Sequence, residues 1–343
     1  MRALIGAAAL FCLWACDDAS APTGMLVLSA KDGLLDVTPY AGLLADPERA
    51  LSIEDVADGS ASSAFEPLLD CMPNLGQSAG AYWVKVRLHT PEAPSPFVFF
   101  SVDWPRLEDV RIYWREGSGF ASYTSGWRMP FQDRAVASPM HAFRVPVDPK
   151  GSTEVWVRVQ SRSELIFPMS VAWPERFSER SRQMGLFSGL IWGMIAALTF
   201  FNLLVYLRLR RAYQLHYVLC VATFTASWAL NGGYYGAFGR MSTSSIPIPE
   251  LLISASIFFR IWFTREFLKL ASVAPRWNVA LSITQWIFVP LAVLFGVGAT
   301  FLGDDSPGLP GVDTLIFLML VLAGIRAARV GRPARRPSLR RRR

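Results

Sequence analysis

The sequence predicts two parts: an all-β domain of the jelly-roll or sandwich type in residues 25–180, and an α-helical transmembrane bundle in residues 183–330. The first part contains short β-type runs that turn residues interrupt about every eight to twelve positions, which is typical of β-sandwiches. The second part consists mainly of long apolar runs. The step in composition between the two parts falls near Arg182.

Several runs in the first part have the pattern of β-strands. Residues 81–88 and 155–159 alternate apolar and polar side chains, and residues 97–102 form a continuous apolar run that fits a strand buried on both faces. Residues 110–114 are a further candidate, whereas residues 52–56 are the one stretch where a helical period competes. Three aromatic side chains of these strands are expected in the core: Trp83, Tyr113 and Trp156.

Residues 1–21 have the features of a signal peptide, because Arg2 precedes an apolar run that is too short for a membrane span. Two cleavage positions are compatible with this segment. Cys16 ends a Leu-Trp-Ala-Cys sequence like that of lipoproteins and would then be lipidated, whereas Ala19-Ser20-Ala21 has the small-x-small pattern of an ordinary cleavage site. Both alternatives, like a retained N-terminal anchor, place the β domain outside the cytoplasm.

The second part is expected to cross the membrane about five times. The predicted spans are residues 186–207, 214–235, 251–270, 279–301 and 312–325. The first four have the length that a bilayer core requires, and the fifth is short. Basic residues gather in the loops after the first and third spans and in the tail at residues 331–343. The positive-inside rule therefore places these loops and the C-terminus in the cytoplasm.

The net charge of +7 comes from the C-terminal tail rather than from a basic surface. Nine of the 34 basic residues lie at positions 326–343, which leaves 25 basic against 27 acidic residues in the rest of the chain. A basic run directly after an apolar helix is typical of a cytoplasmic membrane flank. We therefore expect the lipid bilayer as a partner and no nucleic acid.

The sequence contains no pattern of catalytic or metal-binding residues. The four cysteines and three histidines are scattered, and no glycine-rich phosphate loop occurs, so we expect neither a metal nor a cofactor. Glu54-Asp55 and Glu108-Asp109 are adjacent carboxylates whose side chains point to opposite faces of an extended chain. Paired acid–base catalysis needs both carboxylates on one substrate bond, so we do not expect an enzyme.

A jelly-roll domain can bind sugars by stacking aromatic faces on the ring and by fixing hydroxyls with polar groups. Trp104 and Trp127 lie beside the turn residues Pro105 and Gly126, so these two tryptophans are expected at the surface. The candidate ligand-binding residues are Trp104, Trp127, Arg128 and His141. The alternative is that they are ordinary core or surface residues.

Polar residues inside the predicted spans are candidates for a role in signalling. Arg260 lies near the middle of the third span, where an ionisable side chain is costly and often functional. It is a candidate for signal relay, and snorkelling toward the cytoplasmic side is the alternative. Asn202 and His216 are candidates for hydrogen bonds between helices.

Several short motifs occur along the chain in a definite order. In the β domain they are Leu51-Ser52-Ile53-Glu54-Asp55-Val56, Asn74-Leu75-Gly76, Asp109-Val110-Arg111-Ile112-Tyr113, Phe143-Arg144-Val145-Pro146 and Val155-Trp156-Val157-Arg158-Val159. Over residues 36–177 this order resembles the type-2 extracellular sensor of the bacterial seven-transmembrane receptors with diverse intracellular signalling modules (7TMR-DISM). In the helical part, Asn202-Leu203-Leu204-Val205-Tyr206 and Phe263-Thr264-Arg265-Glu266-Phe267-Leu268 resemble that family's membrane domain.

The resemblance implies a jelly-roll sensor related to carbohydrate-binding modules, placed in the periplasm and anchored in the bacterial inner membrane. It also implies that the helices relay the binding of a small, carbohydrate-like ligand. The family continues into further helices and an output module, whereas this chain runs into Arg-Pro-Ser-Leu and four arginines. We therefore expect a C-terminally truncated or naturally short receptor that needs a separate cytoplasmic signalling protein. The alternatives are a membrane transporter and a membrane-anchored carbohydrate-binding protein with a β-sandwich accessory domain.

Overall fold

The computed structural model describes residues 24–68, 73–78, 80–149, 151–162, 164–243, 248–291, 293–294 and 312–330. An antiparallel β-sandwich is followed by a helical region, which confirms the predicted fold class. The chain divides into two compact units: the first combines Met1–Phe187 with Leu230–Ser244, and the second combines Ser188–Ala229 with Ser245–Arg343. The predicted signal peptide with Cys16 and the predicted tail at 331–343 lie outside the described residues.

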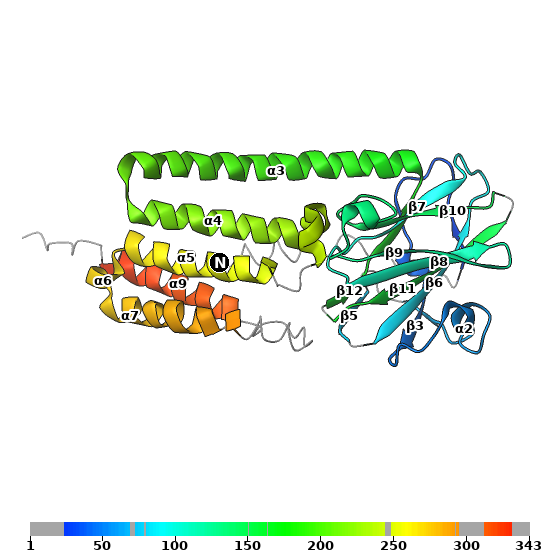
Figure 1. Ribbon diagram of the computed structural model, residues 1–343, viewed down its shortest axis with the longest axis horizontal. Coiled ribbons are helices and arrows are strands. Elements are labelled where there is room, and N and C mark those ends of the chain that lie inside the picture. The colour runs from blue at the N-terminus through cyan, green and yellow to red at the C-terminus, as the bar shows by residue number, and fades with distance from the viewer. Residues whose placement is uncertain are drawn as a thin grey trace, which may run out of the picture. The chain divides into compact units, whose positions relative to one another are not determined.

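In the described part of the chain, the larger sheet of the sandwich has seven strands. They are β1 (Leu26–Val27), β3 (Gly42–Asp46), β4 (Glu66–Pro67), β6 (Ala81–His89), β8 (Asp109–Glu116), β9 (Gly119–Ser125) and β11 (Ser152–Gln160). The order is β4-β3-β6-β11-β8-β9 with antiparallel neighbours, and β1 joins β6 in parallel. Figure 1 labels β3, β6, β11, β8 and β9 of this sheet. The strands predicted at 81–88, 110–114 and 155–159 are thus confirmed.

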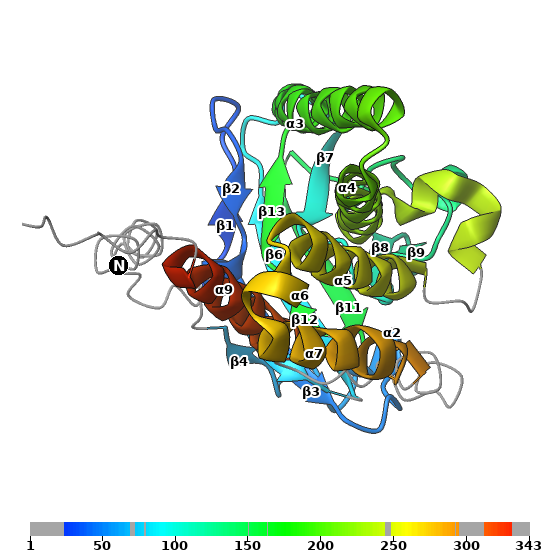
Figure 2. The same cartoon turned by 90° about the vertical axis from the view of Figure 1, so that its left-hand side faces the viewer.

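The smaller sheet has the order β10-β7-β13-β2. Its strands are β2 (Leu35–Asp36), β7 (Phe97–Val102), β10 (His141–Pro146) and β13 (Met169–Ala172). Figure 2 shows β2, β13 and β7 side by side. A separate antiparallel pair consists of β5 (Asn74–Gln77) and β12 (Glu164–Ile166), and the short helices of this unit are η1 (Thr38–Tyr40), α2 (Ile53–Ala57) and η2 (Phe131–Asp133).

The main core lies between the two sheets, because the alternation along each strand turns one set of side chains inward. β6 and β11 contribute valines and a leucine, and the smaller sheet contributes aromatic rings: Val84, Val86, Leu88, Val155, Val157, Val159, Phe100 and Phe143. Trp83 and Trp156 are buried on the opposite face of the larger sheet, under α2. Their predicted burial is confirmed, whereas Tyr113 is only half-buried beside them.

A capping box fixes the start of α2 above these two tryptophans. The Ser52 hydroxyl accepts the Asp55 N–H at 3.3 Å, and the Asp55 carboxylate accepts the Ser52 N–H at 2.9 Å. These bonds satisfy N–H groups that a helix end otherwise leaves unpaired. The helical period at residues 52–56 is therefore confirmed, and α2 places its apolar side on Trp83 and Trp156.

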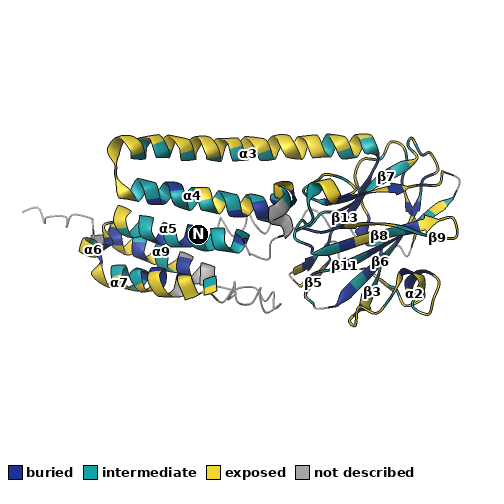
Figure 3. Cartoon of the chain, in the orientation of Figure 1, coloured by how far each residue is buried: buried dark blue, intermediate teal, exposed yellow. Residues whose placement is uncertain are grey.

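The helical region begins directly after β13. Its elements are α3 (Pro174–Leu209), α4 (Ala212–Asn231), η3 (Tyr234–Thr243), α5 (Ile248–Phe267), α6 (Leu270–Val273), α7 (Pro275–Ile283), the π-helix η4 (Thr284–Phe288) and α9 (Val312–Val330). Among the described residues, α3 is the one helix long and apolar enough to cross a membrane, and Leu318–Ala328 is a shorter apolar helix. Residues of α3 are exposed along most of its length (Figure 3).

The described helices differ at their ends from the predicted spans. α4 ends at Asn231 rather than at residue 235, because Gly232 follows and Gly233 has a φ of +99° that a helix does not accept. α5 ends at Phe267, and Lys269 then adopts a left-handed φ of +48°. The membrane positions of the five predicted spans stay a prediction.

Candidate functional site

The four candidate ligand-binding residues belong to adjoining segments of the β-sandwich. Trp104 follows β7, Trp127 and Arg128 follow β9, and His141 is the first residue of β10. The Trp127 N–H donates to the Leu107 carbonyl at 2.9 Å, which joins the loop after β9 to the loop after β7. The fold therefore brings together residues that the sequence places in three segments.

Trp127 is buried, with 8% of its surface exposed, although its position beside a turn predicts an exposed side chain. Tyr235 of η3 packs against the indole, with ring centroids 4.7 Å apart and an interplanar angle of 55°. Tyr235 itself is 1% exposed. The Arg128 guanidinium lies over the indole at 4.9 Å from the ring centroid. A ring from a distant part of the chain thus covers Trp127, while Trp104 and Arg128 are half-buried.

His141 is fully buried inside the sandwich. Its Nδ1 lies 2.9 Å from the Ser125 hydroxyl at the end of β9. Burial, and secondly the charge of Arg134, lowers the pKa of His141 to about 3, against the opposing effect of the Trp104 and Pro105 backbone. The imidazole is therefore neutral at physiological pH and acts as a hydrogen-bonding group.

Arg134 is a buried cation that no local sequence pattern identifies. Its Nε donates to the Met129 carbonyl at 3.0 Å, and its Nη1 donates to the Ser138 carbonyl at 2.8 Å. Its Nη2 donates to the carbonyls of Gly126 at 2.9 Å and Trp127 at 3.3 Å. Burial lowers the pKa of Arg134 to about 10, so the side chain stays charged at neutral pH. Its acceptors are backbone carbonyls, which every residue carries, so the sequence alone does not reveal its role.

Residues Leu230–Gly239 form a docking segment that lies against this loop within the first unit. Gly233 has a φ of +99°, and a Cβ there would lie 2.3 Å from the Pro139 carbonyl oxygen. A Cβ at Gly236 would lie 2.7 Å from Nη2 of Arg134. Both positions need glycine, because a side chain would prevent the two backbones from approaching this closely.

The first turns of α3 are fixed to the smaller sheet. Phe177 stacks on Phe99 of β7, with centroids 4.3 Å apart and an interplanar angle of 22°. Arg180 donates to Oδ2 of Asp103 through Nη1 at 3.1 Å and Nη2 at 3.2 Å, and the Ser170 hydroxyl donates to the same oxygen at 2.9 Å. The start of α3 is therefore part of the first unit and not a loose linker.

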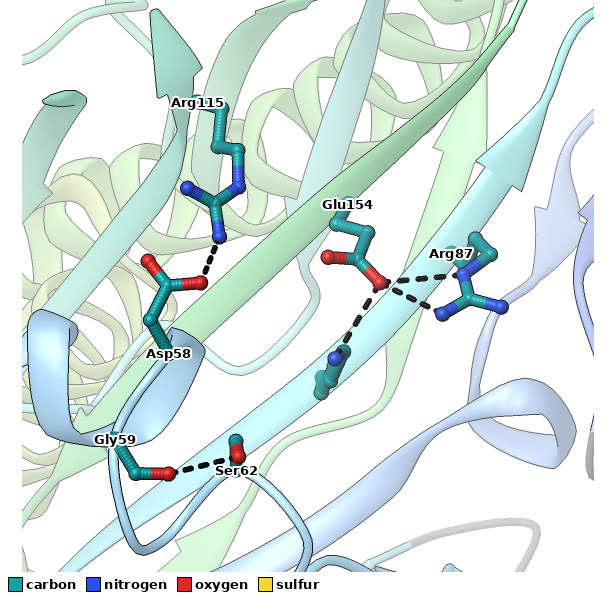
Figure 4. A network of polar contacts seen from close by, with 7 residues as sticks. Asp58, Gly59, Ser62, Arg87, Arg115 and Glu154 are labelled. Atoms are coloured by element: carbon teal, nitrogen blue, oxygen red, sulfur yellow. Dashed lines mark hydrogen bonds and ion pairs between the residues drawn. The ribbon is translucent and has the colours of Figure 1, made fainter. Parts of the chain in front are cut away.

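A band of ion pairs crosses the outer face of the larger sheet (Figure 4). Glu154 accepts a hydrogen bond from Arg87 at 2.8 Å and lies 3.3 Å from Nζ of Lys85, and Arg115 pairs with Asp58. Burial raises the pKa of Glu154, but the bonds from Arg87 and Lys85 outweigh it, so the pKa is lowered overall. Each of these cations has an acidic partner, so the band does not by itself form an anion-binding site.

Arg260, the candidate for signal relay, lies in α5 and is half-buried. Its carbonyl accepts a hydrogen bond from the Thr264 hydroxyl at 2.9 Å, one turn later in the same helix. Asn202 donates to the Leu198 carbonyl at 2.8 Å, so its described bond lies within α3 and not between helices.

His216 of α4 contacts two side chains of α5, although the predicted hydrogen bond is not formed at its Nδ1. Its ring stacks on Trp262 with centroids 4.2 Å apart, and its Nδ1 lies 3.4 Å from Oε2 of Glu266. Trp262 donates to the other oxygen of Glu266 at 3.1 Å. Within the described ranges, no group of three or more His, Cys, Asp and Glu residues could hold a metal ion.

Two family models match the chain. The model described as 7TMR-DISM extracellular 2 matches residues 38–172, which correspond to the β-sandwich. The model described as 7TM diverse intracellular signalling matches residues 185–338, which correspond to the helical region. No curated protein matches the chain.

Proposed function

The chain belongs to the 7TMR-DISM family of seven-transmembrane receptors with diverse intracellular signalling modules, and we propose that its β-sandwich is a periplasmic sensor for a small, carbohydrate-like ligand. The family makes it a membrane protein with an extracellular domain and an association with signalling. In our proposal, residues 183–330 span the bacterial inner membrane and the C-terminus lies in the cytoplasm. A separate cytoplasmic signalling protein then responds to the arrangement of the helices.

The observation that carries this proposal is the rigid junction between the sandwich and α3. One residue, Trp173, separates β13 from α3, and its indole N–H donates to the Ser29 carbonyl at 2.8 Å. The stacking of Phe177 and the ion pair of Arg180 hold the next two turns. In our proposal, these contacts pass a shift of the smaller sheet to the first turns of α3. Such a relay requires a ligand that binds one arrangement of the protein more tightly than the other.

We propose that the ligand binds near Trp104, Trp127, Arg128 and His141. Trp104 and Arg128 are half-buried and so retain surface that a ligand can contact. Trp127 and His141 are buried. The half-buried Trp104 offers an aromatic face that can cover an apolar side of a sugar, and Arg128 offers a guanidinium that can donate to its hydroxyls.

A ligand screen on the full chain in lipid nanodiscs tests this proposal. Thermal unfolding is followed with monosaccharides, oligosaccharides and, for comparison, small organic acids. We expect a sugar to raise the unfolding temperature, because a ligand that binds only the folded state stabilises it. Trp104→Ala and Arg128→Ala should abolish the shift, whereas Arg87→Ala on the outer face should retain it. Stabilisation by organic acids alone would exclude a carbohydrate ligand, and no stabilisation at all would remove the ligand proposal.

Two further assignments belong to the same proposal. Arg260 takes part in the relay, because an arginine in the middle of an apolar helix is costly to keep without a role. Lipidation of Cys16 would add a second attachment to the membrane. Mass spectrometry of the N-terminal peptide tests the lipid, and Arg260→Leu tests the relay through the response of the cytoplasmic partner.

A further inference from the structure

We propose that the docking segment, Leu230–Gly239, is a latch through which the sensor controls the arrangement of α4 and α5. The proposal rests on the receptor function above and adds a second connection to the one at α3. It assigns a role to Trp127 that differs from simple ligand contact. In this structure the latch is closed, because the Tyr235 ring packs on the Trp127 indole.

The docking segment has one side against the sensor and another toward solvent. The residues of the first side are buried: Leu230, Gly233, Tyr235 and Gly236. The residues of the second side are exposed: Gly232, Ala237 and Phe238. This division is what a specific tertiary contact produces, and a loop without a partner would not bury a tyrosine to 1% exposure.

The surface that receives the segment is organised by Arg134. The guanidinium binds four backbone carbonyls of the loop after β9 and lies directly opposite Gly236. These bonds fix the loop at the position where the segment packs. Arg134 is thus a positioning residue for docking, and Tyr235 and Trp127 form the contact itself.

The segment begins in α4, and α4 is hydrogen-bonded to α5. Its first two residues are the last two of α4, and α5 begins at Ile248. The Ser227 hydroxyl of α4 donates to the Pro249 carbonyl at the start of α5 at 2.8 Å. Further along, Sγ of Cys220 lies 3.7 Å from the Ser256 hydroxyl. Movement of the docking segment would therefore act on both helices near their bonded ends.

Docking and ligand contact exclude each other at Trp127. Tyr235 and Arg128 already cover the indole, so a sugar ring can stack there only if Tyr235 leaves. A ligand that contacts Trp104 and Arg128 and then reaches Trp127 would open the latch. Such a ligand shifts the population toward the open latch, and the size of the shift depends on how much more tightly it binds the open state than the closed one.

Photo-crosslinking tests whether the segment docks in the membrane-embedded protein. Benzoylphenylalanine replaces Tyr235 in the full chain in nanodiscs, and Phe238, which is 53% exposed, carries the same group as the matched control. We expect an intrachain crosslink from position 235 to the loop of residues 126–134, and none from position 238. Equal crosslinking of that loop from both positions would overturn the docked state.

The reactivity of Cys220 tests whether docking controls the helices. The rate of labelling with N-ethylmaleimide is measured on the peptide that contains Cys220, so other cysteines do not interfere. We expect Tyr235→Ala to raise the rate about ten-fold, since loss of one aromatic contact shifts a two-state equilibrium by roughly that factor. Phe238→Ala should leave the rate unchanged, and Gly236→Ala, which keeps the tyrosine, should act like Tyr235→Ala.

Equal labelling rates in the Tyr235→Ala, Gly236→Ala and Phe238→Ala variants would overturn the latch. That result would leave the ligand proposal intact, because the labelling experiment uses no ligand. Conversely, failure of the ligand screen would leave the docking and labelling results in place. The two proposals are therefore tested separately.

Discussion

Arg180 and Asp103 join α3 to the sensor domain through a single carboxylate oxygen, which accepts both terminal nitrogens of the guanidinium at 3.1 and 3.2 Å. The two side chains are only 32% and 20% exposed. The neighbouring pair of Arg176 and Glu179 has a similar distance, 3.3 Å, but 54% and 44% exposure. The Arg180–Asp103 pair is therefore shielded from water, whereas the Arg176–Glu179 pair at the same end of α3 is solvated.

Asp103→Ala should lower the free energy of unfolding of the sensor by about 1–2 kcal/mol, because Arg180 and Ser170 both lose their acceptor. Glu179→Ala should change it by less than about 0.5 kcal/mol, since solvated ion pairs contribute little. Denaturant titration of both variants, followed by circular dichroism, measures the difference. Similar values for the two variants would show that the Asp103 pair does not strengthen the junction.

Because His141 is buried, we expect the free energy of unfolding to fall in acid. The pKa of His141 is lowered to about 3 in the folded protein, whereas an unfolded histidine titrates near about 6.5. The unfolded chain therefore binds more protons between these values. The contribution of His141 is fully present above the unfolded pKa and is lost as the pH falls toward the folded pKa. Within this window the loss is roughly 1 kcal/mol per pH unit.

His141→Gln isolates this effect, because glutamine can bond to Ser125 but does not titrate in this range. The free energy of unfolding of this variant should fall less steeply between about pH 6 and pH 4 than that of the wild type. Carboxylates contribute to both proteins and cancel in the comparison. Parallel curves would mean that His141 is not responsible for the acid sensitivity.

Gly233→Ala should weaken docking, because the added methyl meets the Pro139 carbonyl oxygen at 2.3 Å and the backbone has a φ of +99°. We expect a loss of about 1–3 kcal/mol in the free energy of unfolding of the first unit. Gly189→Ala in α3 is the matched control, since nothing lies within 4 Å of its added Cβ and alanine favours a helix. A stability of Gly233→Ala equal to that of this control would contradict the close approach.

Ser52→Ala should cost about 1 kcal/mol, because it removes the side chain that caps α2. Ser52→Thr keeps a hydroxyl and should cost much less. The loss of the cap should also loosen the cover on Trp83 and Trp156, which near-ultraviolet circular dichroism detects as a weaker tryptophan signal. An unchanged spectrum in Ser52→Ala would show that α2 is held by its apolar contacts alone.

The strands were predictable because their signal is local. The alternation of apolar and polar side chains in residues 81–88 predicts which side chains point inward, and the burial along β6 follows this pattern. The surroundings of Trp127 were not predictable, because Tyr235 lies beyond two helices in the sequence. Turn residues beside Trp127 indicate a loop, but they carry no information about what packs on that loop.

The end of α4 also has one cause that is local in the sequence and one that depends on tertiary structure. Gly232 and Gly233 mark the end of α4 in the sequence, since both residues disfavour a helix. The second reason for Gly233, its approach to Pro139, depends on tertiary structure. The sequence therefore marks where α4 ends, but it does not reveal what Gly233 packs against.

The docking segment also determines when the sensor domain can be completed during synthesis. The ribosome finishes β13 long before it reaches Tyr235, and α3 and α4 are made in between. A newly made sandwich therefore leaves Trp127 uncovered until both helices have emerged and the chain has returned. Domains generally fold as units while the chain grows. The sensor domain differs in one respect, because Tyr235, which covers Trp127, follows α3 and α4 in the sequence. The cover on Trp127 is therefore completed only after α3 and α4 have been made.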